Sequence, residues 1–191
     1  NGQDALEKVA TAAPDLILLD IMMPIIDGFT VCRILKENDD TRLPLETLKM
    51  LAEKITEVPE NFKLHPRVQK IVDDRIAMAR GDLPLDWGMA ENLAYATLLT
   101  EGYPVRLSGQ DSQRGTFFHR HATWHDQNRK ELHEGAYTPL QHLAPDQADF
   151  VAINSLLSEE AVLGFEYGYA TAEPNSLVLW EAQLGDFANG A

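Results

Sequence analysis

The sequence contains little that would form a disulfide framework, a membrane span or a basic surface. Its single cysteine, Cys32, lies in the pattern FTVCRIL, which indicates a helical core thiol rather than a nucleophile or a disulfide partner. No apolar run approaches the roughly 18 residues of a membrane span, and no signal peptide opens the chain. With 16 Lys and Arg against 30 Asp and Glu, the net charge of −14 argues against a nucleic-acid surface or a polybasic membrane contact. These absences predict a cytoplasmic protein without a nucleic-acid or membrane partner.

The length and the apolar content predict a globular protein of one or two domains. The 191 residues are 45% hydrophobic, which is enough for a packed α/β core. We find no internal repeat, no low-complexity stretch and no linker rich in serine and glycine. The chain begins at Asn1 rather than at a methionine and ends at Ala191 in an expected helix start, so both ends are expected to be cut.

Residues 1–40 predict a helix, a strand, a loop and a second helix. A weak apolar stripe marks residues 5–10, Leu16–Leu19 form a continuous apolar run, and apolar residues at helical spacing mark residues 29–35. Asp20 follows the strand directly. An aspartate at the end of a buried parallel strand is well placed for chemistry.

The string DLILLDIMMPIIDGFTVCRILKE resembles the receiver domain of bacterial two-component response regulators. The resemblance implies that Asp20 is a phosphoacceptor beside a bound magnesium ion, and that Asp27 and Gly28 turn the chain into the next helix. The alternative for Asp20 is a strand-end or helix-capping carboxylate. The family's acidic pair and its later strands have no counterpart here, so we expect 1–40 to be a truncated receiver fragment, phosphorylated inefficiently, in a truncated or chimeric reading frame.

The rest of the chain predicts a helical lead-in over residues 41–85, followed by an α/β domain over 86–191. Apolar residues recur at helical spacing over 45–55 and 68–78, with Pro59 closing the first of these helices. After residue 86 the apolar patterns alternate between helix and strand, which predicts a parallel sheet. The expected elements are a helix over 87–101, a strand over 105–107, a long polar loop, a strand over 150–153, a helix over 159–172 and a strand over 177–180.

The polar run RLSGQDSQRGTFFHRHA, residues 106–122, follows the first of these strands. It holds two histidines and three arginines, and α/β folds place ligand sites where parallel strands end. This predicts a site for an anionic substrate. Arg106, Arg114 and Arg120 either meet substrate carboxylates or pair with acids such as Asp111.

The nearby histidines were considered as ligands of a zinc ion. His121 and His125 are four residues apart, and His133 follows. The sequence between them has no cysteine pair and no HExxH motif, so no metal site is predicted here.

Three strings identify a family over the region from about Thr41 to the end of the chain. DWGMAENLAYATLLTEGYPV, YTPLQHL and LLSEEAVLGFEYGYATAEPNSLVLWEAQLGDFANGA, together with the polar run, resemble the decarboxylating component of the 2-oxoglutarate dehydrogenase complex, a thiamine diphosphate enzyme. The resemblance implies a partial transketolase-like pyrimidine-binding domain over 86–191. It also implies oxidative decarboxylation of 2-oxoglutarate in the tricarboxylic acid cycle, succinyl transfer to a lipoyl-bearing succinyltransferase component, and a homodimer in the full-length family.

Glu160 is the main mechanistic candidate. Ser158 is a natural N-cap, so Glu159 and Glu160 fall in a first helical turn, where carboxylates are common. By the resemblance, Glu160 hydrogen-bonds the aminopyrimidine ring of thiamine diphosphate and favours its imino tautomer, which deprotonates the thiazolium carbon; the ylid then attacks the keto carbon of the substrate. This role requires Glu160 to be buried enough to be protonated near neutral pH.

The resemblance assigns further roles nearby. Phe187 falls on an aromatic position of the shelf for the pyrimidine ring, and Leu184 falls where related enzymes carry phenylalanine; without the family, Phe187 is equally well a core residue. His121, the second histidine of HRH, falls in the active centre and steadies the substrate or intermediate. His119, its neighbour, and His142 are weaker candidates for substrate binding.

The diphosphate and its magnesium ion need a GDG motif followed by a distant asparagine in this class of enzyme. Gly81-Asp82 and Gly185-Asp186 are not followed by glycine. We therefore expect the magnesium and diphosphate ligands on a domain absent from this chain, weak cofactor binding, and no activity of this chain alone.

Overall fold

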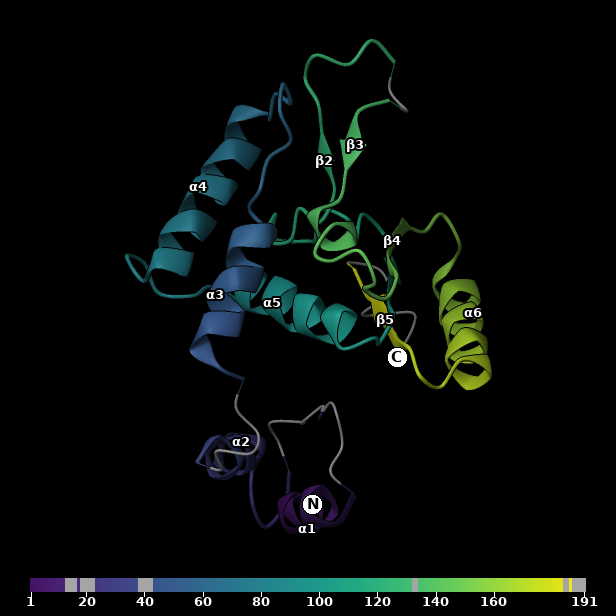
Figure 1. Ribbon diagram of the computed structural model, residues 1–191. Helices are drawn as coiled ribbons and strands as arrows, with labels where there is room; N and C mark the ends of the chain where they lie inside the picture. The colour runs from purple at the N-terminus through teal and green to yellow at the C-terminus, as the bar shows by residue number, and fades with distance from the viewer. Residues whose placement is uncertain (13–16, 18–22, 38–42, 132–133, 184–185, 187–191) are drawn as a thin grey trace. The chain divides into compact units, whose positions relative to one another are not determined.

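The computed structural model describes residues 1–12, 17, 23–37, 43–131, 134–183 and 186 (Figure 1). The chain divides into two compact units, Asn1–Pro44 and Leu45–Ala191. Asp20, His133, Leu184 and Phe187, which the sequence analysis considered as site residues, lie outside the described residues. The predicted domain boundaries at residues 40 and 85 stay predictions.

The first unit contains the helices α1 (Gly2–Ala12) and α2 (Gly28–Lys36), which contact each other. Asp27 caps α2, because its Oδ1 accepts a hydrogen bond of 2.8 Å from the backbone N–H of Thr30. Asp27 therefore leads into this helix as the sequence indicates. The strand expected at Leu16–Leu19 falls almost wholly outside the described residues.

Three helices open the second unit: α3 (Leu45–Lys54), α4 (Pro66–Arg80) and α5 (Trp87–Thr100). The sequence caps two of them locally. His65 caps α4 through its Nδ1, and Asp86 caps α5 by accepting a hydrogen bond of 2.7 Å from the N–H of Met89. Within the described residues no helix is long and apolar enough to cross a bilayer.

A three-stranded parallel sheet follows, with the strand order β4-β1-β5. Val105, which begins the central strand, lies opposite Phe150 on one side and Leu177 on the other. The helix α6 (Glu159–Ala172) connects the two outer strands. This arrangement confirms the predicted parallel-sheet α/β class, and the strands are β1 (Val105–Gly109), β4 (Phe150–Asn154) and β5 (Leu177–Glu181).

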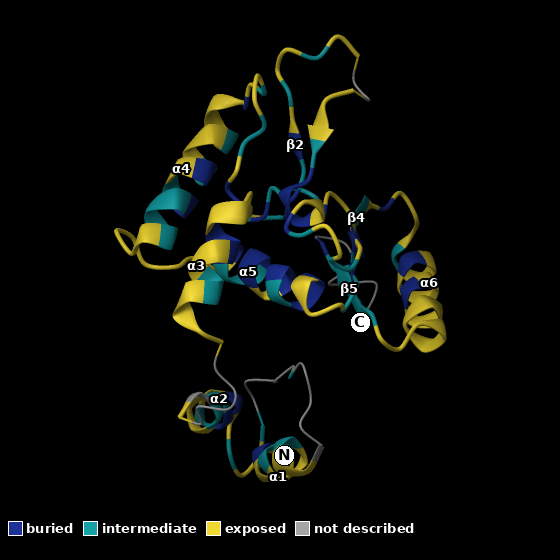
Figure 2. Ribbon diagram, viewed as in Figure 1, coloured by how far each residue is buried: buried dark blue, intermediate teal, exposed yellow. Residues whose placement is uncertain are grey.

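The central strand presents different chemistry to the two faces of the sheet. Successive side chains of a strand point to opposite faces. Val105 is buried in the core that contains α5, and Leu107 is also buried, whereas Arg106 reaches Glu166 of α6. The helices α5 and α6 therefore cover opposite faces. Figure 2 shows α5 largely buried and α6 with a broad exposed face.

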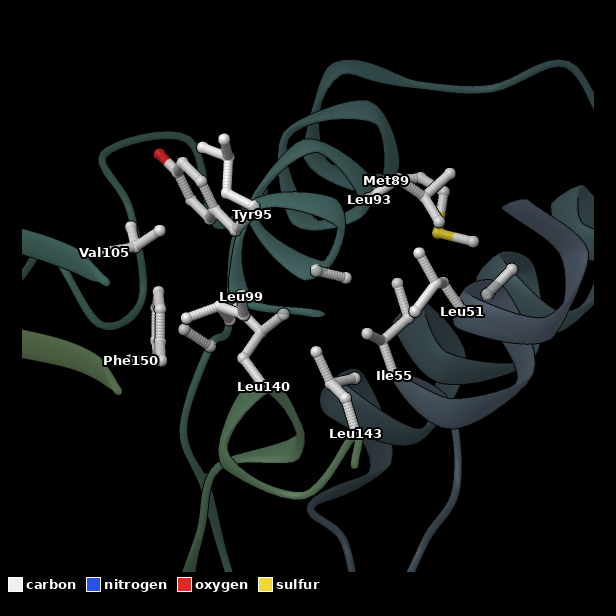
Figure 3. Close-up of a cluster of buried hydrophobic side chains, with 14 residues drawn as sticks. Leu51, Ile55, Met89, Leu93, Tyr95, Leu99, Val105, Leu140, Leu143 and Phe150 are labelled. Atoms are coloured by element: carbon white, nitrogen blue, oxygen red, sulfur yellow. The ribbon is translucent and has the colours of Figure 1, made fainter. Parts of the chain in front are cut away.

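The main core joins α3, α5 and the sheet (Figure 3). Each fully buried apolar side chain there stabilises the fold by about 1.5–3 kcal/mol before conformational entropy is counted. The side chains of this core that Figure 3 labels are Leu51, Ile55, Met89, Leu93, Tyr95, Leu99, Val105, Leu140, Leu143 and Phe150. A smaller cluster of Leu64, Val72 and Trp124 packs α4 against the segment after the central strand.

The connection between β1 and β4 contains more structure than the predicted polar loop. β2 (Trp124–His125) pairs antiparallel with β3 (Ala136–Tyr137), and a 3-10 helix, η2, spans Pro139–Gln141. Strands of two residues carry no detectable alternation, so sequence patterning misses them. The prediction that Pro59 closes the first helix of this region was also wrong, because α3 ends at Lys54.

Candidate active site around the histidine loop

The segment of residues 110–123, here called the histidine loop, follows β1 and is tied to the end of β4. The Ser112 Oγ donates a hydrogen bond of 2.7 Å to the carbonyl of Ile153, and the Gln113 Nε2 donates one of 2.9 Å to the carbonyl of Ala152. These bonds hold the loop at the carboxyl edge of the parallel sheet, the edge where α/β folds place ligands.

Arg120 anchors the middle of the histidine loop. Its side chain is 4% exposed, and its Nε and Nη2 donate to the two carboxylate oxygens of Glu91 at 2.9 and 2.7 Å. Its Nη1 donates to the carbonyl of Ser112 at 2.7 Å and to the carboxylate of Glu181. Burial opposes the charge, but the two carboxylates raise the pKa of Arg120 above its usual value. Arg120 therefore stays cationic and joins α5, the loop and β5.

A second buried arginine, Arg75 of α4, holds the loop backbone. Its Nη2 donates to the carbonyl oxygens of His119 and Arg120 at 2.9 and 2.5 Å. Burial lowers the pKa of Arg75 to about 10, against the attraction of Asp86 and Glu91. The side chain thus remains charged at neutral pH and fixes the two peptide groups that precede His121.

The arginines of the polar run all pair with acids of the chain. This is the second of the two alternatives that the sequence left open for them. Arg106 makes a bidentate pair with Glu166, with N–O distances of 2.7 and 2.9 Å. Arg114 lies 2.5 Å from Asp111, but its Nε is buried and has no hydrogen-bond partner among the described residues. Of these three arginines, Arg114 is the one with a buried donor that lacks a partner among the described residues.

His121 lies half-buried in a pocket of about 400 Å³. Its backbone is left-handed, with φ +40°, and Asp111 and Phe118 of the same loop are also left-handed. Such strained backbone in non-glycine residues concentrates at functional sites. The pocket is lined by Leu64, His65, Arg67, Val68, Asp111, Gln113, Arg114, Phe118, His121, Thr123, Trp124, His125, Gln127, Arg129 and Asn154.

Burial, and then the charges of Arg75 and Arg114, lower the pKa of His121 below its usual 6.5. The ring is therefore neutral at pH 7.

The lowered pKa of His121 makes the stability of the fold depend on pH. The unfolded chain protonates His121 near pH 6.5 and the folded chain does so only at lower pH, so the unfolding free energy declines as the pH falls from 6.5 toward the folded pKa. We expect a smaller decline in His121→Gln, measured by urea unfolding at pH 7.5 and 5.5. The exposed His142→Gln should keep the decline of the parent, and equal declines in parent and His121→Gln would contradict the prediction.

His119 faces the anchor rather than the pocket. Its Nε2 lies 3.8 Å from the Glu91 carboxylate and 3.4 Å from the Nη2 of Arg120, and its Nδ1 is buried without a described partner. The pocket lining does not include it. Its predicted weak role in substrate binding stays a prediction.

Gly115 allows the His119 ring to pack closely. Its φ is +82°, and a Cβ at this position would lie 2.5 Å from the Cε1 of His119. We expect Gly115→Ala to cost about 2 kcal/mol or more of unfolding free energy in urea melts, through backbone strain and displacement of the ring. Gly102→Ala is the matched control, because φ there is +92° and the space is open. Equal costs at the two glycines would show that His119 moves freely.

His142 lies away from the pocket that contains His121. It is exposed, and its ring stacks on Tyr137 with centroids 4.7 Å apart and an angle of 2°. The pocket lining does not include it. Its predicted weak role in substrate binding stays a prediction.

Glu160 is exposed, so the burial expected of it was wrong for this chain. It lies in the first turn of α6, which packs through Val162 and Glu166. At 3.6 residues per turn, Glu160 points about 200° away from Val162, on the opposite side of the helix. Ser158 occupies the N-cap position, but its side chain makes no capping hydrogen bond.

Sequence reasoning missed Arg75, Glu91 and Glu181, which hold the loop. One signal was available: Glu91 is the sole charged residue in α5, where eight residues are buried. A carboxylate in such a helix needs a cationic partner. Nothing local indicates that the partner is Arg120, 29 residues away.

Neither a metal centre nor a second pocket competes with the histidine loop among the described residues. No group of three or more His, Cys, Asp or Glu side chains comes together in the described part of the chain in a way that would hold a metal ion. A hollow of about 710 Å³ between α3 and α4 is larger than the pocket at His121. It has side chains of both charges and no residue of the histidine loop, so we place the candidate site at the loop.

The parallel sheet, with a polar loop and a pocket at its carboxyl edge, defines an α/β ligand-binding domain. The family model described as "Transketolase, pyrimidine binding domain" matches residues 84–191, more than half of the chain. The chain belongs to this family. The model described as "Response regulator receiver domain" matches residues 1–58, which confirms the resemblance stated for the first part.

Similar proteins carry the name "2-oxoglutarate dehydrogenase E1 component". The one from Cupriavidus necator is 62% identical over 152 residues, which are 80% of this chain and 16% of that protein. The one from Haemophilus influenzae is 56% identical over 153 residues, and the one from Coxiella burnetii 56% over 152, with the same shares covered. The chain therefore spans about a sixth of the length of the curated relatives that it matches.

Proposed function

We propose that residues 84–191 supply the pyrimidine-binding half of the active site of a thiamine diphosphate-dependent 2-oxoglutarate dehydrogenase. The observation that carries the proposal is that the matched region has the histidine loop and its pocket at the carboxyl edge of its sheet. Relatives at 62% and 56% identity are named for this activity. The reaction is oxidative decarboxylation of 2-oxoglutarate, with succinyl transfer to the lipoyl arm of a succinyltransferase component, in a homodimer.

The chain's residues fit one end of the cofactor. When bound, thiamine diphosphate supplies the nucleophilic carbon and the electron sink for loss of carbon dioxide from a 2-oxo acid. The Glu160 carboxylate is exposed and makes no hydrogen bond within the described residues, so it is free to hold the aminopyrimidine. Leu184 and Phe187 would provide the apolar contacts of the ring. The ligands of magnesium and diphosphate are expected outside this chain.

The histidine loop would orient the substrate. His121 is neutral at pH 7, so one ring nitrogen can donate to a substrate oxygen while the other accepts. Arg75 and Arg120 hold the peptide groups on either side of the loop turn in place, so the ring is positioned before the substrate arrives. His119 supports this arrangement through its contact with Arg120.

A chimeric enzyme tests the proposal. The matching segment of the Cupriavidus necator relative is replaced by residues 45–191 of this chain, and 2-oxoglutarate-dependent dye reduction is measured with saturating thiamine diphosphate and magnesium. We expect activity within about tenfold of the intact relative, because most positions are identical. A folded chimera that binds the cofactor but does not turn over would contradict the proposal. Calorimetric titration of the cofactor into this chain alone shows how much binding this half provides.

The match of residues 1–58 favours a second candidate function, phosphoacceptance at Asp20. Incubation of the chain with labelled acetyl phosphate and magnesium tests it. Label in the parent and none in Asp20→Ala would support a receiver function, and equal labelling would exclude Asp20 as the acceptor.

A further inference from the structure

The hollow between α3 and α4 has no part in the proposed function. Its volume is about 710 Å³, and it lies outside the region 84–191 that matches the family model. The two helices pack against each other (Figure 1), and Met50, Ile76 and Ala79 provide the apolar lining of the hollow. Its other lining residues are polar or charged. A groove between two helices with an apolar centre is a surface on which a third helix can pack.

The outward face of α3 forms one wall of this hollow. At about 100° per residue, Glu46, Lys49, Met50, Glu53 and Lys54 fall within about 140° of the helix surface, and the buried residues of α3 lie on its other side. Met50 is 53% exposed, although it lies near the centre of this face. An apolar side chain surrounded by charged ones has the arrangement of an interface, with an apolar core and a polar rim.

The charges on this face are complementary to themselves in the reverse direction. Glu46 and Lys54 are each four residues from Met50, and Lys49 and Glu53 are centred one residue further along the chain. When two copies of α3 lie antiparallel about this centre, each acid faces a base of the other copy, whereas a parallel pair would place like charges together. A two-fold axis produces such an antiparallel pair and makes each contact twice.

The charged groups of the hollow are weakly engaged within the chain. Lys49 pairs with Glu46 at 3.2 Å, but the two side chains are 48% and 85% exposed. Exposed pairs of this kind contribute little to stability, so their members can change partners readily. Glu53 and Arg80 make no ion pair within the described part of the chain. Arg80, on the α4 wall, is therefore available to an acid of an incoming helix.

We propose that the full chain self-associates by docking α3 of one copy, antiparallel, into the α3–α4 hollow of a second copy. The Met50 side chains of the two copies meet near the two-fold axis, and Lys49 of each copy lies beside Glu53 of the other. The occupant is a second copy because the order of charges on α3 fits its own reverse. The contact goes beyond the proposed function and is separate from the homodimer proposed for the full-length enzyme, since it uses no residue of 84–191.

Sedimentation velocity of the full chain over about 1–300 µM tests the proposal, because small contacts have dissociation constants in or above the micromolar range. We expect a dimer that forms as the concentration rises. Lys49→Glu and Glu53→Lys each place like charges opposite each other twice and should weaken the association about tenfold or more. Lys70→Glu is the matched control, because it makes the same charge change on α4 outside the hollow and also breaks an exposed ion pair, with Asp74. It should leave the association unchanged.

Mixing the two charge-reversal variants distinguishes a direct contact from a loss of folding. One variant then has acids at positions 49 and 53 and the other has bases at both, so the antiparallel pairs are again opposite in charge. We expect the mixture to form heterodimers with an affinity near that of the parent, although each variant alone associates weakly. The double variant, with both changes in one chain, should also dimerise. Circular dichroism verifies that all variants are folded.

A chain that stays monomeric over the whole concentration range would overturn the proposal. An undiminished dimer in Lys49→Glu, or a mixture that associates no better than its two components, would do the same. Tyr167→Ser tests a second exposed surface, on α6, where Tyr167 is 75% exposed. Loss of the dimer in Tyr167→Ser, with the dimer retained in Lys49→Glu, would place the contact on α6 and overturn the assignment to α3. An inactive chimeric enzyme would overturn the proposed function and leave this contact intact.

Discussion

Arg120→Met is expected to destabilise the second unit by about 3 kcal/mol. The substitution keeps an apolar stem of similar length but removes a guanidinium that is 4% exposed and paired with Glu91 and Glu181. Removing one partner of a buried pair costs about 3–5 kcal/mol, because the other charge is left unpaired. We expect the lower end of this range, since the two acids retain 23% and 19% exposure and regain some hydration.

Urea unfolding followed by tryptophan fluorescence, to which the buried Trp124 contributes, measures this effect. Trp124 is 1% exposed, and its Nε1 donates to the carbonyl of His121, so it reports on the histidine loop. Arg67→Met is the matched control, because Arg67 is exposed and carries no ion pair within the described residues; its effect should stay within about 0.5 kcal/mol. A second variant, Arg120→Met with Glu91→Gln, should recover part of the loss. A cost below about 1 kcal/mol for Arg120→Met alone would show that the anchor is not needed for stability.

Local signals explain why much of the fold could be predicted. The strands starting at Val105, Phe150 and Leu177 and the helix Glu159–Ala172 begin where predicted, because apolar runs and acidic first turns lie within a few residues of each boundary. The same logic fails for Trp124–His125, where a two-residue strand has no period to detect.

The location of the candidate site could be predicted from the sequence, but the hydrogen bonds and ion pairs that hold it together could not. The histidine and arginine content of the loop after β1 indicated the place, and the pocket at His121 lies there. The partners of Arg120 lie 29 and 61 residues away and on different elements, so only tertiary packing selects them. Side-chain direction on a helix likewise depends on which face packs, and this is why the burial of Glu160 was wrongly predicted.

The exposure of Glu160 places a condition on its role in the proposed function. A carboxyl that holds a proton for the pyrimidine ring needs a low-dielectric surrounding, and this chain does not provide one. In the chimeric enzyme, the remainder of the larger protein must therefore cover the first turn of α6. The two neighbouring acids Glu159 and Glu160 should then differ in effect, although they are chemically identical.

Glu160→Gln in the chimeric enzyme should lower kcat for 2-oxoglutarate by about 10²–10⁴-fold, because glutamine keeps a hydrogen bond but cannot exchange the proton. Glu159→Gln makes the same change one residue earlier, where no role in the chemistry is proposed, and should stay within about threefold of the parent. Dye reduction at saturating cofactor measures both. Glu160→Asp, which restores the acid on a shorter arm, should recover part of the rate. Equal losses at 159 and 160, or a fully active Glu160→Gln, would remove Glu160 from the chemistry and leave the histidine loop as the sole candidate on this chain.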